Sequence, residues 1–178
     1  MSDVIEFNPV DAIGAGAFGQ PGARTFVIQA RKGDALLSVL VEKEQVALLA
    51  TEAEQFLDRI EAEEPDAELD PQVDAMSVDD CGPVEEDEPL FRARLIGIGY
   101  DPERHLVLIE LREDAADEEE PPPPLDEGEG RVARLYATRA QVRAMVAHGA
   151  ASVDAGRPRC QLCDFPMDPD GHICPRWN

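Results

Sequence analysis

The sequence predicts an α+β fold in which two helices cover one face of a mostly antiparallel sheet. Runs of β-branched and apolar residues, separated by turn residues, recur along the chain and predict strands. Two other segments place apolar residues three and four positions apart, which is the spacing of an amphipathic helix. A cysteine-rich stretch then separates a tail at 156–178 from an α+β domain at 1–155.

In the first half of the chain, we expect a short strand at 4–7 and a glycine-rich turn region at 14–22. Two segments rich in β-branched and apolar side chains follow, at 24–31 and 35–42, and the turn Lys-Gly-Asp at 32–34 separates them. This arrangement predicts an antiparallel hairpin.

In the second half, strands are expected at 91–100, 105–112 and 132–137, and the turn at 101–104 joins the first two. These strands repeat the pattern of the first half, in which strands also precede a helical segment. The second half therefore adds to the same mostly antiparallel sheet.

Each half is expected to end in a helix, the first at 43–61 and the second at about 138–153. Thr138 is the expected N-cap of the second helix, and Gln141 lies three positions later, as in a capping box. The first helix has one apolar face, formed by Val46, Leu49, Ala53, Phe56, Leu57 and Ile60.

The two halves also align at an offset of 96 residues, which sets Val46 on Val142. The alignment predicts a possible duplicated strand–helix unit, although so few matched positions can also arise by chance. The matched residues include Val39-Leu40-Val41 with Leu135-Tyr136-Ala137, Lys43 with Arg139, and Gln45 with Gln141.

The charge of the 178-residue chain is −22, and two proline-containing segments at about 62–89 and 113–130 carry nearly all of it. Like charges repel and proline interrupts helices and sheets, so we expect solvated loops there, although a nucleic-acid mimic or a bait for a basic partner is an alternative. A net anionic protein repels phosphate backbones, which disfavours nucleic-acid binding.

No apolar run is long enough for a membrane span and no leader is recognisable, so a cytoplasmic location without membrane contact is expected.

The glycines at 14, 16 and 19 spell G-x-G-x-x-G, a pattern typical of dinucleotide-binding turns. Such a turn needs a helix directly after it to receive the phosphates. Here Pro21-Gly22 and a strand follow, so the segment is interpreted as a turn between strands without a nucleotide.

The tail has the clearest chemical pattern, because three of the four cysteines fall within 15 residues. Cys160-x-x-Cys163 has the spacing of a knuckle turn that directs two thiolates at one metal ion, and His172 and Cys174 share one face of an extended segment. Together they predict a tetrahedral Cys₃His site for structural Zn²⁺. Free thiols, a redox pair or another fourth ligand remain alternatives, and Cys81 in the acidic loop is interpreted as a spare thiol.

A metal ion saturated by protein ligands leaves no position for substrate, and no Ser/His/Asp or Cys/His catalytic set is recognisable. We therefore expect a non-catalytic binding or regulatory protein of unknown protein partner. The residues that could form its partner surface are Arg157, Arg159, Arg176 and Trp177. The alternatives are nucleic-acid contact through the tail alone, and a hydrolase or transferase with a cleft on the domain. The polar candidates for such a cleft are Arg24, Gln29, Glu42, Lys43 and Glu110.

Three stretches resemble an uncharacterised actinobacterial family, the domain of unknown function three-zero-nine-zero. They are A-F-G-Q-P-G-A-R-T-F at 17–26, V-E-K-E-Q-V at 41–46, and the ending G-R-P-x-C-x-L-C…D-P-D-G-H-x-C-P-R-x-N. The resemblance covers nearly the whole chain and is most specific in the tail. The resemblance implies that members of the family have these cysteines in common, and that the protein is cytoplasmic and actinobacterial. It implies no particular activity.

Overall fold

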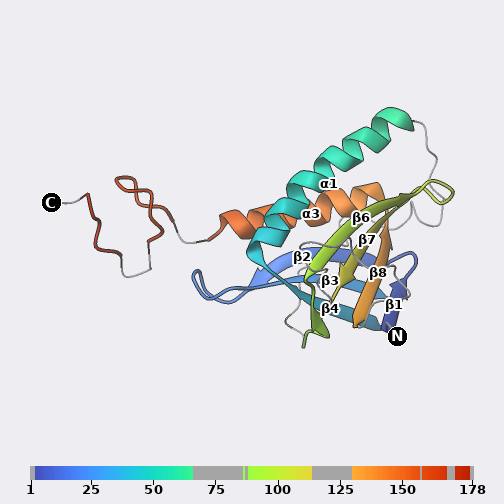
Figure 1. The fold of residues 1–178 in the computed structure, drawn as a ribbon, viewed down its shortest axis with the longest axis horizontal. Coiled ribbons are helices and arrows are strands. Elements are labelled where there is room, and N and C mark those ends of the chain that lie inside the picture. Colours follow the sequence, from blue (N-terminus) through green and yellow to red (C-terminus); the bar gives the residue numbers. More distant parts are fainter. Residues whose placement is uncertain are drawn as a thin grey trace, which may run out of the picture.

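The computed structural model describes residues 3–65, 86, 88–113, 130–156, 158–167 and 171–176. Most of the two acidic segments therefore lies outside the described residues. Helices α1 and α3 pack against each other on one side of the sheets, and the tail leads away from the end of α3 (Figure 1). The elements are β1 (Asp3–Phe7), β2 (Ala12–Phe18), β3 (Thr25–Lys32), β4 (Ala35–Val41), α1 (Lys43–Glu63), β5 (Phe91–Arg92), β6 (Leu95–Asp101), β7 (Leu106–Arg112), β8 (Arg131–Ala137) and α3 (Arg139–Asp154).

The α+β class is confirmed, with two helices and mostly antiparallel strands, but the expected single sheet is in fact two four-stranded sheets. Their strand orders are β1-β8-β7-β6 and β2-β3-β4-β5. Each sheet contains one parallel pair, β1 with β8 and β4 with β5, and every other pair is antiparallel. The predicted hairpin between β3 and β4 is present along its whole length.

The glycine-rich turn predicted at 14–22 is wrong in its first part, because residues 14–18 belong to β2 and pair with β3. The turn is confined to the residues after Phe18, where Gly19 and Gly22 have positive φ angles of 91° and 96°. The reason is tertiary packing: a Cβ on Gly149 of α3 would lie only 3.3 Å from the Cβ of Ala15. Small residues in β2 let α3 approach, and this packing outweighs their low strand propensity.

The strand predicted at 91–100 is also wrong, because the chain divides there between the two sheets. The backbone N–H of Ala93 donates to Leu40 O in one sheet (2.8 Å), and the N–H of Arg94 donates to Arg112 O in the other (2.8 Å). Residues before this point form β5, and residues after it form β6. The break is set by distant partners, so no local pattern marks it.

The two halves have the same element order, four strands followed by a helix, and the first strand of each half pairs in parallel with the last strand of the other. The possible duplication is therefore visible in the topology. Register extends it to single residues, because Phe26 and Val107 occupy the same place in their sheets. Phe26 faces Ala17 and Val41, and Val107 faces Tyr100 and Ala137.

One glutamine in each half carries out the same task. Gln141 accepts from the backbone N–H of Thr138 (2.9 Å) and donates to Asp11 O (3.2 Å). Gln45 accepts from the N–H of Glu42 (2.8 Å) and donates to the carbonyl of Arg94 (3.1 Å). Each side chain thus completes a capping box at its own helix. Each also donates a hydrogen bond to a backbone carbonyl between the first two strands of the other half.

The core lies between the two sheets and under the helices. The predicted apolar face of α1 is confirmed, because Val46, Leu49, Ala53, Leu57 and Ile60 are buried. None of the helices in the described part of the chain is long and apolar enough to cross a membrane. The most buried large side chains include Ile13, Ile28, Leu57, Leu106, Ile109, Leu111, Leu135 and Met145.

Candidate metal centre

A tight loop positions the first two cysteines of the tail. The N–H of Cys160 donates to Phe165 O and the N–H of Asp164 donates to Cys160 O, both at 2.9 Å. Asp164 adopts a positive φ of 61°, which reverses the chain directly after Cys163. A β-bridge between Arg159 and Pro166 closes the loop. The Cys-x-x-Cys segment therefore forms the knuckle turn that its spacing predicts.

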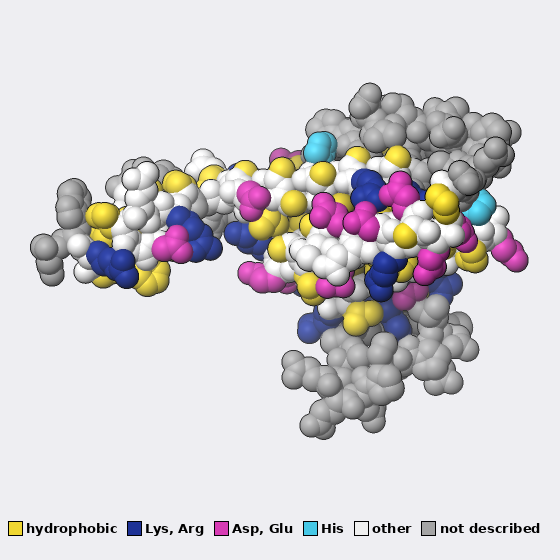
Figure 2. All heavy atoms as spheres, turned by 90° about the horizontal axis from the view of Figure 1, so that it is seen from above, with side chains coloured by type: hydrophobic (Ala, Val, Ile, Leu, Met, Phe, Trp, Pro, Cys, Tyr) yellow, Lys and Arg dark blue, Asp and Glu magenta, His cyan; other side chains and the backbone are white. Residues whose placement is uncertain are grey.

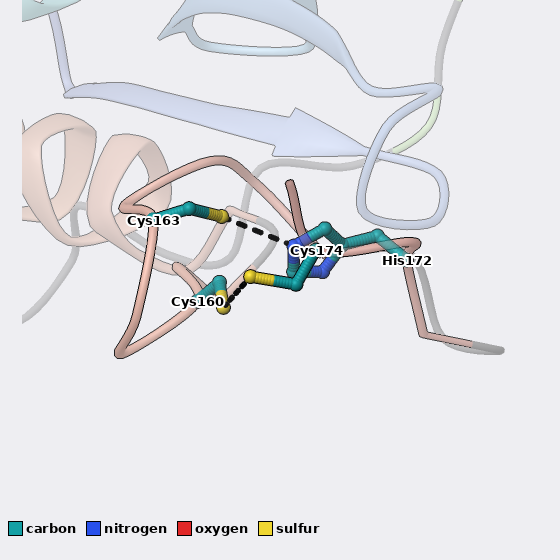
Figure 3. Close-up of side chains that lie close together, drawn as sticks. All are labelled: Cys160, Cys163, His172 and Cys174. Carbon is teal, nitrogen blue, oxygen red and sulfur yellow. Dashed lines mark hydrogen bonds between the residues drawn. The ribbon is translucent and has the colours of Figure 1, made fainter. Parts of the chain in front are cut away.

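The structure brings all four predicted ligands together, and their ligand atoms lie within 4.8 Å of one another. Figure 3 shows Cys160 facing Cys174 and Cys163 facing His172. The two sulfur atoms of the first pair are 3.9 Å apart, and Cys163 Sγ is 3.2 Å from His172 Nε2. A disulfide needs an S–S distance of about 2.0 Å, so these are free thiols.

These distances can be tested against the predicted metal. Zinc–sulfur bonds of about 2.3 Å and zinc–nitrogen bonds of about 2.0–2.1 Å give tetrahedral edges of about 3.8 Å between two sulfurs and about 3.6 Å between sulfur and nitrogen. The observed 3.9 and 3.2 Å lie close to these values. The four ligand atoms, all within 4.8 Å of one another, therefore lie close enough to bind one metal ion.

The surroundings favour thiolate at one end of the cluster. The backbone N–H groups of Leu162 and Cys163 point at the Cys160 sulfur, and they lower the pKa of its thiol below the usual value. Desolvation raises the pKa of the Cys163 thiol. Cys160 and Cys174 are buried, and Nδ1 of His172 is buried without a hydrogen-bond partner in the described part of the chain. The other ring nitrogen, Nε2, faces the Cys163 sulfur.

The predicted partner surface is described only in part, because Arg157 and Trp177 lie outside the described residues, as does Cys81. Arg159 forms an ion pair with Asp164 (3.0 Å), and Arg176 donates to Leu162 O (3.1 Å). Sequence reasoning missed the apolar side chains on the same loop. Leu162, Phe165 and Ile173 are 52%, 58% and 98% exposed. Hydrophobic and basic side chains lie side by side on the tail in Figure 2.

Of the five polar residues suggested for an enzyme cleft, three line one groove of about 510 Å³, namely Arg24, Glu42 and Lys43. The other two lie elsewhere: Gln29 is buried against Ser38, and Glu110 pairs with Arg134 at 3.2 Å. The groove also contains Arg92 from β5 and Arg159 from the tail, which sequence reasoning did not connect with it. No sequence signal marks this site, because its residues are far apart along the chain.

A family model described as "Protein of unknown function (DUF3090)" matches residues 5–174. The matched segment contains all four candidate metal ligands and both halves of the fold. No curated protein and no solved structure matches the chain.

Proposed function

The chain belongs to the DUF3090 family of proteins of unknown function, and from its metal centre we propose that it is a non-catalytic binding or regulatory protein. In this proposal, Cys160, Cys163, His172 and Cys174 hold one structural Zn²⁺ that folds the tail. The observation that carries it is the closed Cys₃His cluster, whose four ligand atoms lie within 4.8 Å of one another.

Structural and catalytic zinc sites differ in the number of protein ligands. A catalytic site keeps one position for water or substrate, whereas a structural site has all four positions filled by protein. Three thiolates and one imidazole fill a tetrahedron, and thiolate-rich sets are typical of zinc. The tail contributes little to the buried core of the domain. Metal binding would therefore supply the free energy that folds it.

The folded tail would present a contact surface to a protein partner. Phe165 and Ile173 are exposed apolar side chains, and Arg176 donates to the carbonyl of Leu162, which is also exposed. Apolar side chains surrounded by arginine are typical of the centre of a protein interface. The partner is expected to bring an apolar contact with acidic groups at its rim. On this chain, Arg157 and Trp177, which lie outside the described residues, are the other two residues predicted for the contact surface.

The alternative function, a hydrolase or transferase, is favoured by one observation, the convergence of Arg24, Glu42 and Lys43 in the groove. However, the described lining residues include no Cys, His, Ser or Asp. The lining carboxylate, Glu42, caps α1 and pairs with Arg92. These groups suit binding of an anion better than general acid–base catalysis.

The first experiment measures metal content by elemental mass spectrometry on protein purified without a histidine tag. We expect about one zinc per chain and one reactive thiol under native conditions, assigned to Cys81. Cys163→Ser should lose the zinc, whereas the matched variant Cys81→Ser should keep it. Cobalt substitution should give the intense visible bands of tetrahedral thiolate coordination. Four reactive thiols and no metal would refute the structural zinc.

A second experiment addresses the partner surface once the zinc content is established. Ile173→Asp and Phe165→Asp should retain zinc and lose a partner that the unchanged protein captures by cross-linking in cells. Leu48→Asp is the matched control, because Leu48 is also exposed (62%) but lies on α1. Equal capture by all variants would refute the tail as the partner surface.

A further inference from the structure

The groove of about 510 Å³ lies where the ends of β3 and β4 meet the start of α1 and the base of the tail. Four cations line it, Arg24, Lys43, Arg92 and Arg159, against the single carboxylate of Glu42 among the described lining residues. This concentration of positive charge occurs in a chain with a net charge of −22. A basic groove on an acidic protein points to an anionic ligand.

Two of the four cations are already neutralised. Arg92 forms an ion pair with Glu42, whose carboxylate also belongs to the capping box of α1. Arg159 pairs with Asp164 at 3.0 Å. The net positive charge of the groove therefore rests on the remaining two side chains, Arg24 and Lys43.

These two cations have unused hydrogen-bonding capacity. Arg24 donates from Nη1 to Ser152 O (2.9 Å), but its Nε is buried without a partner in the described part of the chain. Because Nε is buried, a ligand in the groove meets the guanidinium through its other N–H groups, which form charge-assisted hydrogen bonds with oxyanions. Lys43 is exposed at the first position of α1 and has no hydrogen-bond or ion-pair partner among the described residues. The backbone dipoles at this helix end also favour an anion.

The two halves of the fold provide an internal comparison for this pair of cations. Phe26 faces Val41 in the first half as Val107 faces Ala137 in the second, and counting two residues outward from these pairs makes His105 the counterpart of Arg24 and Arg139 the counterpart of Lys43. In the second half, Glu64 at the end of α1 occupies the place between them. Its carboxylate lies 3.3 Å from His105 Nδ1, and its backbone O accepts from Arg139 (3.3 Å). The hydroxyl of Tyr100 donates to the same carboxylate (2.8 Å).

The first half lacks the groups that fill this place. The counterpart of Tyr100 is Ala17, whose methyl group leaves space and offers no hydroxyl. The 96-residue offset sets Glu64 on Cys160, which belongs to the metal cluster. Both halves therefore place two basic residues here, but a carboxylate lies between them in one half and an open groove remains in the other.

We propose that this groove binds a small phosphate monoester with an apolar body. The phosphate lies between Arg24 and Lys43, and its charge of nearly −2 at pH 7 matches these two unpaired cations better than a carboxylate would. The apolar body contacts Leu40, Val153 and Pro166, the apolar lining residues that are not buried. The volume is within the range of roughly 300–1,000 Å³ that is typical of small-molecule sites. This inference does not depend on the identity of the metal.

Calorimetric titration with phenyl phosphate tests the proposal on the full, metal-loaded chain. We expect saturable binding, weakened by about tenfold or more in Lys43→Gln and in Arg24→Gln, since each removes a charge-assisted contact. Arg59→Gln is the matched control, because it removes an exposed positive charge of α1 outside the groove. Its affinity should equal that of the unchanged protein. Thermal unfolding of each variant verifies that it is folded. If Arg24→Gln is unstable, Lys43→Gln still tests the site, because Lys43 is exposed.

Two further probes identify the ligand class. Benzoate keeps the apolar body and carries one charge, and inorganic phosphate keeps the charge without the body, so both should bind more weakly than phenyl phosphate. Benzoate binding as tightly would refute the phosphate, and inorganic phosphate binding as tightly would refute the apolar body. Absence of saturable binding at millimolar phenyl phosphate, or equal weakening in Lys43→Gln and Arg59→Gln, would overturn the site.

Discussion

Gly149 of α3 lies so close to Val46 of α1 that a Cβ added to the glycine would be 2.9 Å from the Val46 Cγ1. The same added atom would lie 3.3 Å from the Cβ of Ala15 in β2. One glycine therefore sets the approach of both helices and of the sheet beneath them. Glycine is intrinsically unfavourable inside a helix, and this close contact explains why a glycine is found at position 149.

Replacing this glycine should destabilise the domain. Gly149→Ala gains up to about 1 kcal/mol of helix propensity, but overpacking a tight contact costs about 1–3 kcal/mol. Val46 cannot easily turn away, because β-branched side chains have one preferred rotamer in a helix. We expect a net loss in the free energy of unfolding, measured by urea denaturation.

Gly97→Ala provides the comparison for this substitution. A Cβ there would meet only the Glu110 Cβ, at an ordinary 3.8 Å. Its free energy of unfolding should be unchanged or slightly higher, since alanine restricts the unfolded chain. If the two substitutions changed the free energy of unfolding equally, the loss of a glycine, and not the close contact between the helices, would explain the effect at position 149.

The two equivalent glutamines should differ in their contribution to stability. Gln141 is 1% exposed, so Gln141→Met would leave the Thr138 N–H and the Asp11 carbonyl without this partner in a buried place. Each buried unsatisfied group costs about 1–3 kcal/mol. Gln45 is only half-buried, and water can replace its contacts. Gln141→Met should therefore lower the denaturation midpoint well below that of Gln45→Met, and similar midpoints would contradict the burial argument.

Local patterns were sufficient to predict the helices, the β3–β4 hairpin and the Cys₃His cluster. The apolar face of α1 repeats within a few residues, and the ligands from Cys160 to Cys174 span only 15 positions. Capping residues such as Thr138 also act on their own helix. Signals of this kind are contained in the segment that folds, so the sequence alone reveals them.

Features that depend on distant partners were not predictable in this way. The small residues of β2 indicate a turn until α3 packs on them, and Ala93 gives no sign that the chain passes there from one sheet to the other. The exchange of β1 and β5 between halves likewise depends on strands far along the chain. The basic groove joins Arg24, Lys43 and Arg159, which only the folded chain brings together.

Acid should remove a stabilising contact at the end of β7. The backbone N–H and guanidinium of Arg131 donate to Glu113 and hold the pKa of its carboxyl below the usual value. A lowered folded-state pKa gives stability that is complete above the unfolded-state pKa, and this stability is lost as pH falls through the folded-state pKa. Because Glu113 is 34% exposed, its contribution is below about 1 kcal/mol.

Urea denaturation of Glu113→Gln across pH measures this contribution. The variant should be less stable than the unchanged protein at pH 7, and the difference should shrink as pH falls through the lowered pKa of Glu113, where the carboxyl becomes protonated. Glu54→Gln, on the exposed face of α1, is the control and should show no such convergence. A difference that stays constant down to acid pH would exclude the titration of Glu113 as its cause.

Removing the proposed metal ion should unfold the tail and leave the domain intact. Most of the core is formed by the two sheets and helices, and none of the four ligands belongs to that cluster. Chelation should therefore expose 158–176 to proteases while the thermal midpoint of the domain changes little. Limited proteolysis with mass spectrometry measures the cleavage sites, and calorimetry measures the midpoint.

The control for chelation is Cys163→Ser, which should reproduce the proteolysis pattern of the metal-free protein without any chelator. A fall of many degrees in the domain midpoint would contradict a boundary near residue 156, because it would mean that the folded tail stabilises the sheets. Protection of the tail after metal loss would instead show that the loop held by Cys160, Asp164 and Phe165 folds through its own hydrogen bonds. The two measurements together thus separate the contribution of the metal ion from that of the backbone.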